Sequence, residues 1–147
     1  MLNQWLNYQT VKTIDSVQDW KEAIKICAEP LLNNHSISSN YIDAIFQLHE
    51  SIGSYYVLAP GIAMPHARPE QGVNKLGLSM LLVKKGVNFN SAENDPVYLI
   101  TLLAANDSTS HIELLTQLAT LFAETKDIQT IFNAKSSDEI LSVINRY

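Results

Sequence analysis

Two nearly unbroken apolar stretches constrain the fold of this chain more than any other feature of its sequence. Residues 76–83 and 97–105 are interrupted only by Ser79 and by Thr101. Both stretches are far shorter than the ~20 residues that a membrane-spanning helix needs. A β-strand that is apolar on both faces must be covered on both faces. Helices are therefore expected on both sides of a sheet, which indicates an α/β fold.

The rest of the chain supplies helices and shorter strands. Apolar residues at helical spacing follow a candidate N-cap at Ser16, and Pro30 is expected to end or kink that helix. Ser110 and Glu113 form a capping pattern at the start of a later helix. Further strands are expected at 10–14, 55–58 and 62–64, and further helices at 39–51, 127–133 and 137–145. A length of 147 residues fits one domain over 1–147.

Charge and cysteine content exclude several classes of protein. Ten Lys and Arg against fifteen Asp and Glu give a net charge of −5, whereas nucleic-acid binding needs a basic patch, so no nucleic acid is expected as a partner. Cys27 is the only cysteine, which rules out an internal disulfide, and it is expected to be a buried apolar residue. The first residues lack the features of a signal peptide. A cytoplasmic protein without membrane insertion is expected.

The segment 59–70 carries the strongest chemical signal. His66 is bracketed by Pro60, Pro65 and Pro69, and proline stiffens the backbone by fixing φ near −65°. A neutral imidazole has one ring nitrogen with a free lone pair and can act as a nucleophile. Arg68 can pair with a phosphoryl group through its planar guanidinium. The alternative is an ordinary turn with a hydrogen-bonding histidine.

His111 is the second candidate. It follows Ser110 and is therefore expected in the first turn of a helix, where unpaired N–H groups favour an anion. With the hydroxyls of Ser108, Thr109 and Ser110 it can form a phosphate-binding cradle. The alternative is a buried structural histidine.

Two more polar residues and a possible metal site need an interpretation. His49 lies on the apolar stripe of the helix at 39–51, next to Glu50, where it either finds a hydrogen bond or lines a cleft. His66, His111 and Glu50 lack the spacing of a known metal motif, so no metal is expected. Walker and GxGxxG motifs are also missing, so no cofactor is expected and a phosphoryl group must come from a protein donor.

The residues from Gly61 to His66 resemble the GxAxPH motif of enzyme IIA domains of the bacterial sugar phosphotransferase system, mannitol/fructose type. His111 falls where that family keeps a second histidine. The stretches 55–60, 66–70, 93–98 and 110–113 look most like the L-ascorbate branch. The resemblance covers essentially the whole chain, and it implies a mixed β-sheet flanked by helices on both faces.

The resemblance also implies a function. The phosphocarrier protein HPr would phosphorylate His66 at Nε2, and His66 would pass the group to a cysteine of the cognate enzyme IIB. The membrane enzyme IIC binds the sugar, here L-ascorbate by branch. His111 would stabilise the phosphoryl oxygens. The alternative is a regulatory IIA-like module that senses phosphorylation and binds other proteins.

Two further expectations concern charge and docking. Mannitol- and fructose-type members carry an Arg-Glu pair in the helix before the motif, whereas this chain has His49 and Glu50. Either Arg68 or a protonated His49 replaces that arginine, and Arg68 is preferred because it is always charged. Glu50 could orient His49 or another ring. HPr is expected to dock on an apolar surface around His66 that includes Ile62 and Met64, with acidic residues nearby.

Overall fold

The computed structural model describes residues 1–107 and 111–147, and it confirms the α/β architecture. Five strands form one sheet in the order β1-β4-β5-β3-β2. They are β1 (Val11–Ile14), β2 (Val57–Ala59), β3 (Ile62–Ala63), β4 (Gly77–Val87) and β5 (Val97–Ala104). The sheet is mixed, because β1 and β4 pair in parallel, as do β3 and β5, whereas β4–β5 and β2–β3 are antiparallel.

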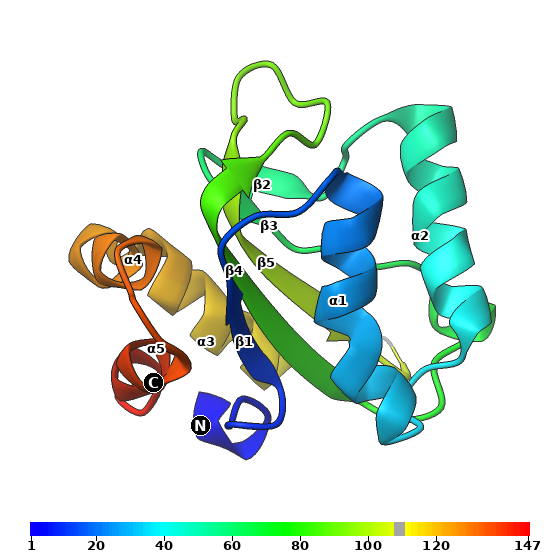
Figure 1. Cartoon of the computed structure of the whole chain (residues 1–147). Helices are drawn as coiled ribbons and strands as arrows, with labels where there is room; N and C mark the ends of the chain where they lie inside the picture. The colour runs from blue at the N-terminus through cyan, green and yellow to red at the C-terminus, as the bar shows by residue number, and fades with distance from the viewer. Residues whose placement is uncertain (108–110) are drawn as a thin grey trace.

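Helices cover both faces of this sheet (Figure 1). One face carries α1 (Trp20–Asn33) and α2 (Ser39–Ile52), and the other carries α3 (Ile112–Ala123), α4 (Thr125–Phe132) and α5 (Ser137–Ile144). Single turns of 3-10 helix occur at η1 (Leu2–Gln4) and η2 (Pro69–Gln71). Among the described residues, no helix is long and apolar enough to cross a membrane.

The two central strands are apolar throughout because successive side chains enter two different cores. Leu82 and Leu99 face α3, α4 and α5, whereas Leu81 and Ile100 face α1 and α2. All four are fully buried. Cys27 is buried in the second core, as expected, and burial raises the pKa of its thiol to about 11.

The start of α1 differs from the sequence expectation. Asp19, not Ser16, is the N-cap, and its carboxylate accepts the backbone N–H of Glu22 at 2.9 Å. The Glu22 carboxylate in turn accepts the N–H of Gln18 at 3.0 Å. Ser16–Asp19 and Asp19–Glu22 are overlapping capping patterns, and the one next to the apolar stripe is used. Pro30 does not end the helix, which continues to Asn33.

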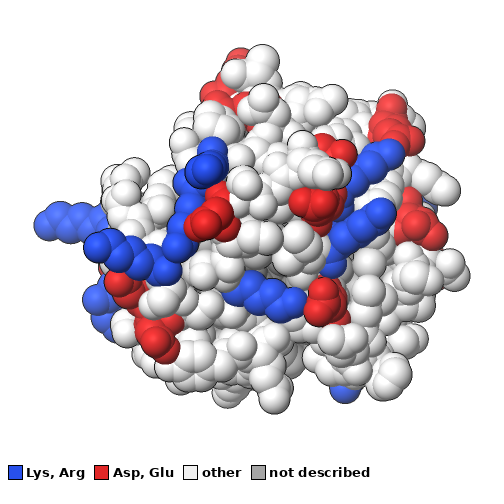
Figure 2. All heavy atoms as spheres, viewed as in Figure 1, with Lys and Arg blue, Asp and Glu red and all other residues white. Residues whose placement is uncertain are grey.

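Charged side chains of both signs are interspersed over the face that carries α1 and β1 (Figure 2). Typical surface pairs are Lys12 with Glu29 at 3.5 Å and Lys84 with Asp15 at 3.8 Å. Basic side chains adjoin one another at the left of this view and acidic ones lie beside them, so the charge on this face is mixed in sign.

Candidate active site

The backbone on either side of His66 is attached to the end of β5. The N–H of Leu103 donates to the carbonyl of Pro65 at 3.2 Å. The N–H of Ala67 donates to the hydroxyl of Tyr41 at 2.9 Å, and that hydroxyl donates to the carbonyl of Leu103 at 2.7 Å. Prolines at 60, 65 and 69 stiffen the same segment. His66 is thus presented from a backbone that is fixed on both sides.

The imidazole of His66 has a defined tautomer. Its Nδ1 lies 2.8 Å from the carbonyl oxygen of Met64. Since a carbonyl oxygen only accepts hydrogen bonds, Nδ1 carries the proton in the neutral ring. Nε2 is then the nitrogen with the free lone pair. The ring of Tyr55 packs edge-on against that of His66, with centroids 5.5 Å apart, and the Tyr55 hydroxyl donates to the His66 carbonyl.

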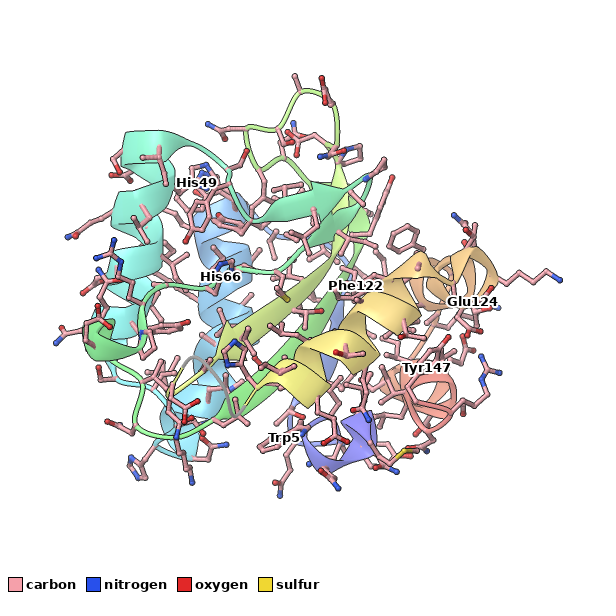
Figure 3. All side chains as sticks on the ribbon, turned by 180° about the vertical axis from the view of Figure 1, so that it is seen from behind. Trp5, His49, His66, Phe122, Glu124 and Tyr147 are labelled. Atoms are coloured by element: carbon pink, nitrogen blue, oxygen red, sulfur yellow. The ribbon has the colours of Figure 1, made fainter. Side chains whose placement is uncertain are left out.

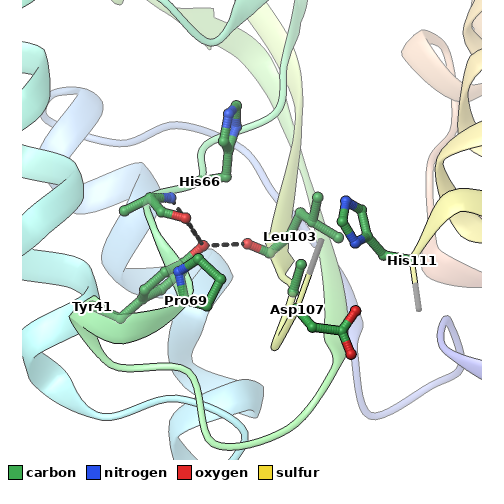
Figure 4. A pocket seen from close by; sticks show the side chains of 8 residues that line it. Tyr41, His66, Pro69, Leu103, Asp107 and His111 are labelled. Carbon is green, nitrogen blue, oxygen red and sulfur yellow. Dashed lines mark hydrogen bonds between the residues drawn. The ribbon is translucent and has the colours of Figure 1, made fainter. Parts of the chain in front are cut away.

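His66 and His111 line the same pocket, which has a volume of about 200 Å³ (Figure 4). His66 comes from the segment after β3 and His111 from the N-terminus of α3. Among the described residues, those that line the pocket are Tyr41, His66, Ala67, Pro69, Leu103, Ala105, Asp107 and His111. The arrangement can hold a small anion next to a nucleophilic nitrogen, because a histidine and a helix N-terminus lie at its edge.

His111 occupies the N-cap position of α3, one residue before the first turn in which the sequence placed it. Its Nδ1 is buried without a hydrogen-bond partner among the described residues. An unpartnered buried ring nitrogen is costly, so a ligand that supplied a partner would be favoured at this place. Ser108, Thr109 and Ser110, expected in the phosphate cradle, lie outside the described residues.

Arg68 lies outside this pocket. Its side chain is exposed, and it is not among the residues that line the cavity. Its backbone N–H donates to Oε1 of Gln71 at 3.0 Å, at the start of η2. The lining residues that the structure describes include neither Lys nor Arg.

The family of the chain follows from comparison with known proteins. The family model for the phosphoenolpyruvate-dependent sugar phosphotransferase system, EIIA 2, matches residues 4–147. The chain belongs to this enzyme IIA family. Membership assigns it to phosphoryl transfer within the sugar phosphotransferase system, and the fold and the two histidines of the pocket are consistent with that assignment.

Two sequence relatives of this enzyme IIA are similarly close. The mannitol-specific cryptic phosphotransferase enzyme IIA component of Escherichia coli (strain K12) is 38% identical over 99% of this chain and 98% of its own length. The ascorbate-specific PTS system EIIA component of the same strain is 34% identical over 94% of this chain and 90% of its own length. Similarity at this level leaves the two specificities open.

Solved structures agree with the fold. The solution structure of the mannitol-specific cryptic enzyme IIA from E. coli has a TM-score of 0.92 at 38% identity and covers 99% of each chain. The complex of enzyme IIAMTL with phosphorylated enzyme IIBMTL from E. coli has a TM-score of 0.81 at 23% identity, over 96% of this chain and 97% of that one. The second likeness shows the fold alone.

His49 of this enzyme IIA is buried away from the pocket. Figure 3 shows His49 near the C-terminal end of α2, at a distance from His66. The side chain is 4% exposed, its ring stacks on Trp20 with centroids 3.7 Å apart, and Nδ1 lies 2.6 Å from the hydroxyl of Tyr56. Burial lowers the pKa of His49, which favours the neutral ring. This environment disfavours a protonated His49 as the replacement for the family arginine.

Glu50 does not orient His49 through a hydrogen bond that the structure shows. Its carboxylate forms an exposed ion pair with Lys21 at 2.5 Å, and the hydrogen bond with Lys21 lowers the pKa of Glu50. His49 is oriented by Tyr56 instead. Among the described residues, no group of three His, Cys, Asp or Glu side chains could hold a metal ion.

The structure adds Tyr41 and Asp107 to the residues predicted from sequence. Tyr41 precedes the apolar Ile42 on α2 and has the sequence context of an ordinary core residue. Nothing in the sequence therefore predicts a role for its hydroxyl. Asp107 stands in the polar turn after β5, where acidic residues are common. The expected docking role of Ile62 was wrong, because that side chain is only 3% exposed; Met64 is half-buried.

Proposed function

We propose that this protein is a cytoplasmic phosphocarrier of the sugar phosphotransferase system. It accepts a phosphoryl group from phospho-HPr on Nε2 of His66 and passes the group to a cysteine of its cognate enzyme IIB. Enzyme IIC, the membrane component, binds the sugar and receives no phosphoryl group itself. The proposal treats residues 1–147 as one enzyme IIA domain.

The observation that carries this proposal is the hydrogen bond from Nδ1 of His66 to the Met64 carbonyl. It fixes the proton on Nδ1 and leaves the Nε2 lone pair free to attack phosphorus. As the Nε2–P bond forms, the P–N bond to the HPr histidine breaks, and its electron pair returns to that ring. The positive charge that develops on the His66 ring is held at Nδ1–H by the carbonyl dipole.

His111 supports the same step electrostatically. It lines the pocket that contains His66, and a ring N–H donor there would stabilise the phosphoryl oxygens. Phosphoryl transfer depends on positioning and charge stabilisation more than on covalent help from the protein. Arg68, Thr109 and Ser110 remain proposed contacts of the phosphoryl group. The exposed side chain of Arg68 would have to turn toward the pocket to reach that group.

Incubation with phospho-HPr tests the proposal. Wild-type protein should be labelled at one histidine, and His66→Gln should not be labelled. His35→Gln is the matched control, because His35 is an exposed loop histidine, and it should be labelled at the wild-type rate. Labelling that persists in His66→Gln would refute the assignment.

For the sugar, we propose L-ascorbate, supported by the ascorbate-specific relative at 34% identity. The mannitol-specific cryptic relative at 38% identity makes mannitol the rival. Labelled protein should transfer its phosphoryl group faster to an ascorbate-type enzyme IIB than to a mannitol-type one. The reverse preference would establish the rival, and acceptance without transfer to either would favour a regulatory module.

A further inference from the structure

Tyr41 is buried at the junction of three segments. It lies near the start of α2, is 0% exposed, and lines the pocket with His66 and His111. Its hydroxyl contacts both the loop after His66 and the end of β5, as the dashed lines in Figure 4 indicate. The hydroxyl of a fully buried tyrosine normally has a hydrogen-bond partner. Here the partners are backbone groups of Ala67, which follows His66, and of Leu103, which also bonds Pro65.

The hydrogen bonds of this hydroxyl have an assigned direction. It accepts from the N–H of Ala67 at 2.9 Å, and its single proton goes to the carbonyl of Leu103 at 2.7 Å, whereas the carbonyl of Ala67 is 3.4 Å away. Burial raises the pKa of Tyr41 to about 12, so the hydroxyl keeps its proton at neutral pH. The Tyr41 oxygen therefore acts as both donor and acceptor.

The Tyr41 oxygen connects the His66 segment to β5 beyond the point where β3 and β5 stop pairing. The parallel pairing of β3 with β5 ends at Ala63, opposite Ile100. One more direct bond joins Pro65 to Leu103, and beyond it Ala67 reaches the same Leu103 only through the Tyr41 oxygen. His66 lies between these two attachments.

We propose that Tyr41 is a positioning residue for phosphoryl transfer, because its hydroxyl holds the Ala67 side of the His66 segment on Leu103. The proposal rests on the proposed function of His66. Without this bridge, only the Pro65 side stays directly attached to β5. The Tyr55 hydroxyl still holds the His66 carbonyl, but the Ala67 side of the segment can shift relative to β5. A displacement of about 1 Å in a reacting group can cost on the order of 100-fold in rate.

Tyr41→Phe tests the bridge because it keeps the ring and removes only the oxygen. We expect the rate of phosphoryl acceptance at saturating phospho-HPr to fall about 10- to 100-fold, with little change in KM, because the donor's docking surface is untouched. The Ala67 amide should exchange faster with solvent, and the NMR signals of the His66 ring should broaden or shift.

Ser79→Ala is the matched control. The Ser79 hydroxyl is also 0% exposed and also donates to a backbone carbonyl, that of Cys27, at 2.7 Å, but it lies outside the pocket. Both variants should lower Tm by a similar amount, about 2–8 °C. Only Tyr41→Phe should slow transfer and alter the His66 signals.

The outcomes separate this inference from the function on which it rests. Wild type that is not labelled at His66 overturns the proposed function. Wild-type labelling together with a Tyr41→Phe rate equal to that of Ser79→Ala overturns the role of Tyr41. If Tyr41→Phe does not fold, hydrogen exchange on the wild type decides: the Ala67 amide should be protected, and rapid exchange there would refute the bridge.

Discussion

Removing the hydroxyl of Tyr56 should destabilise the fold without slowing phosphoryl transfer. This hydroxyl lies 2.6 Å from Nδ1 of His49, and both side chains are buried, at 0% and 4% exposed. In Tyr56→Phe, Nδ1 of His49 is left buried without a partner, which costs about 1–3 kcal/mol. For a chain of this length each kcal/mol corresponds to about 2–4 °C in Tm.

A double-mutant cycle measures the interaction directly. In the wild type, the ring centroids of His49 and Trp20 are 3.7 Å apart. His49→Phe keeps a ring at this place, but it leaves the Tyr56 hydroxyl without its hydrogen-bond partner. The double variant contains neither orphaned group, so it should be more stable than the sum of the two single changes predicts, by about 1–2 kcal/mol. Thermal and urea unfolding at pH 7.5, followed by circular dichroism, give all four free energies of unfolding.

The same variants decide what His49 does. We expect all of them to accept the phosphoryl group within about threefold of the wild-type rate, since a change of 0.6 kcal/mol in the barrier corresponds to roughly that factor. Additive stability changes would refute the buried hydrogen bond. A large loss of transfer in His49→Phe with unchanged transfer in Tyr56→Phe would show that His49 does replace the family arginine.

Three other predictions follow from the structure. His111→Ala should still accept the phosphoryl group, but about 10²- to 10³-fold more slowly, with its thermal unfolding showing a retained fold; an unfolded variant would instead mark a structural histidine. Because burial lowers the pKa of His49, the unfolded chain binds more protons, so the free energy of unfolding should fall as the pH drops below about 6.5, less so in His49→Phe; parallel pH profiles would contradict this. Gly61→Ala should cost about 1–3 kcal/mol by denaturant unfolding, because φ is +81° and the new Cβ would lie 2.8 Å from Cζ of Phe132; a change below about 0.5 kcal/mol would refute the strain.

The sequence predicted those parts of the molecule that depend on patterns within one segment. The two long apolar strands were found because burial on both faces requires an unbroken apolar run, and most helices were found by their stripes. Helix α1 was started at the wrong residue because two capping patterns overlap between Ser16 and Glu22. Local rules do not distinguish such patterns, since the choice depends on where the helix packs.

The pocket depends on contacts between distant segments, and there the sequence was a weaker guide. His66 was marked by its motif and His111 by its place after a strand. Tyr41 lies 26 residues before Ala67 and 62 before Leu103, so its bridging hydroxyl is a product of the fold. His49 lies on the apolar stripe, as predicted. The sequence does not show whether it lines a cleft or finds a hydrogen bond, because its partner Tyr56 lies outside its helix.

The charge of the pocket suits a carrier that must release what it binds. The described lining residues include the carboxylate of Asp107 and two histidines, His66 and His111, and neither Lys nor Arg. A fixed cation would stabilise phospho-His66 itself and would raise the barrier for the next transfer. A hydrogen bond from a neutral histidine N–H stabilises phosphoryl oxygens less than a fixed cation does. On the proposed function, the exposed Arg68 adds its charge to the site only after its inward reorientation, so in the resting site the phosphoryl group is held without a fixed cation.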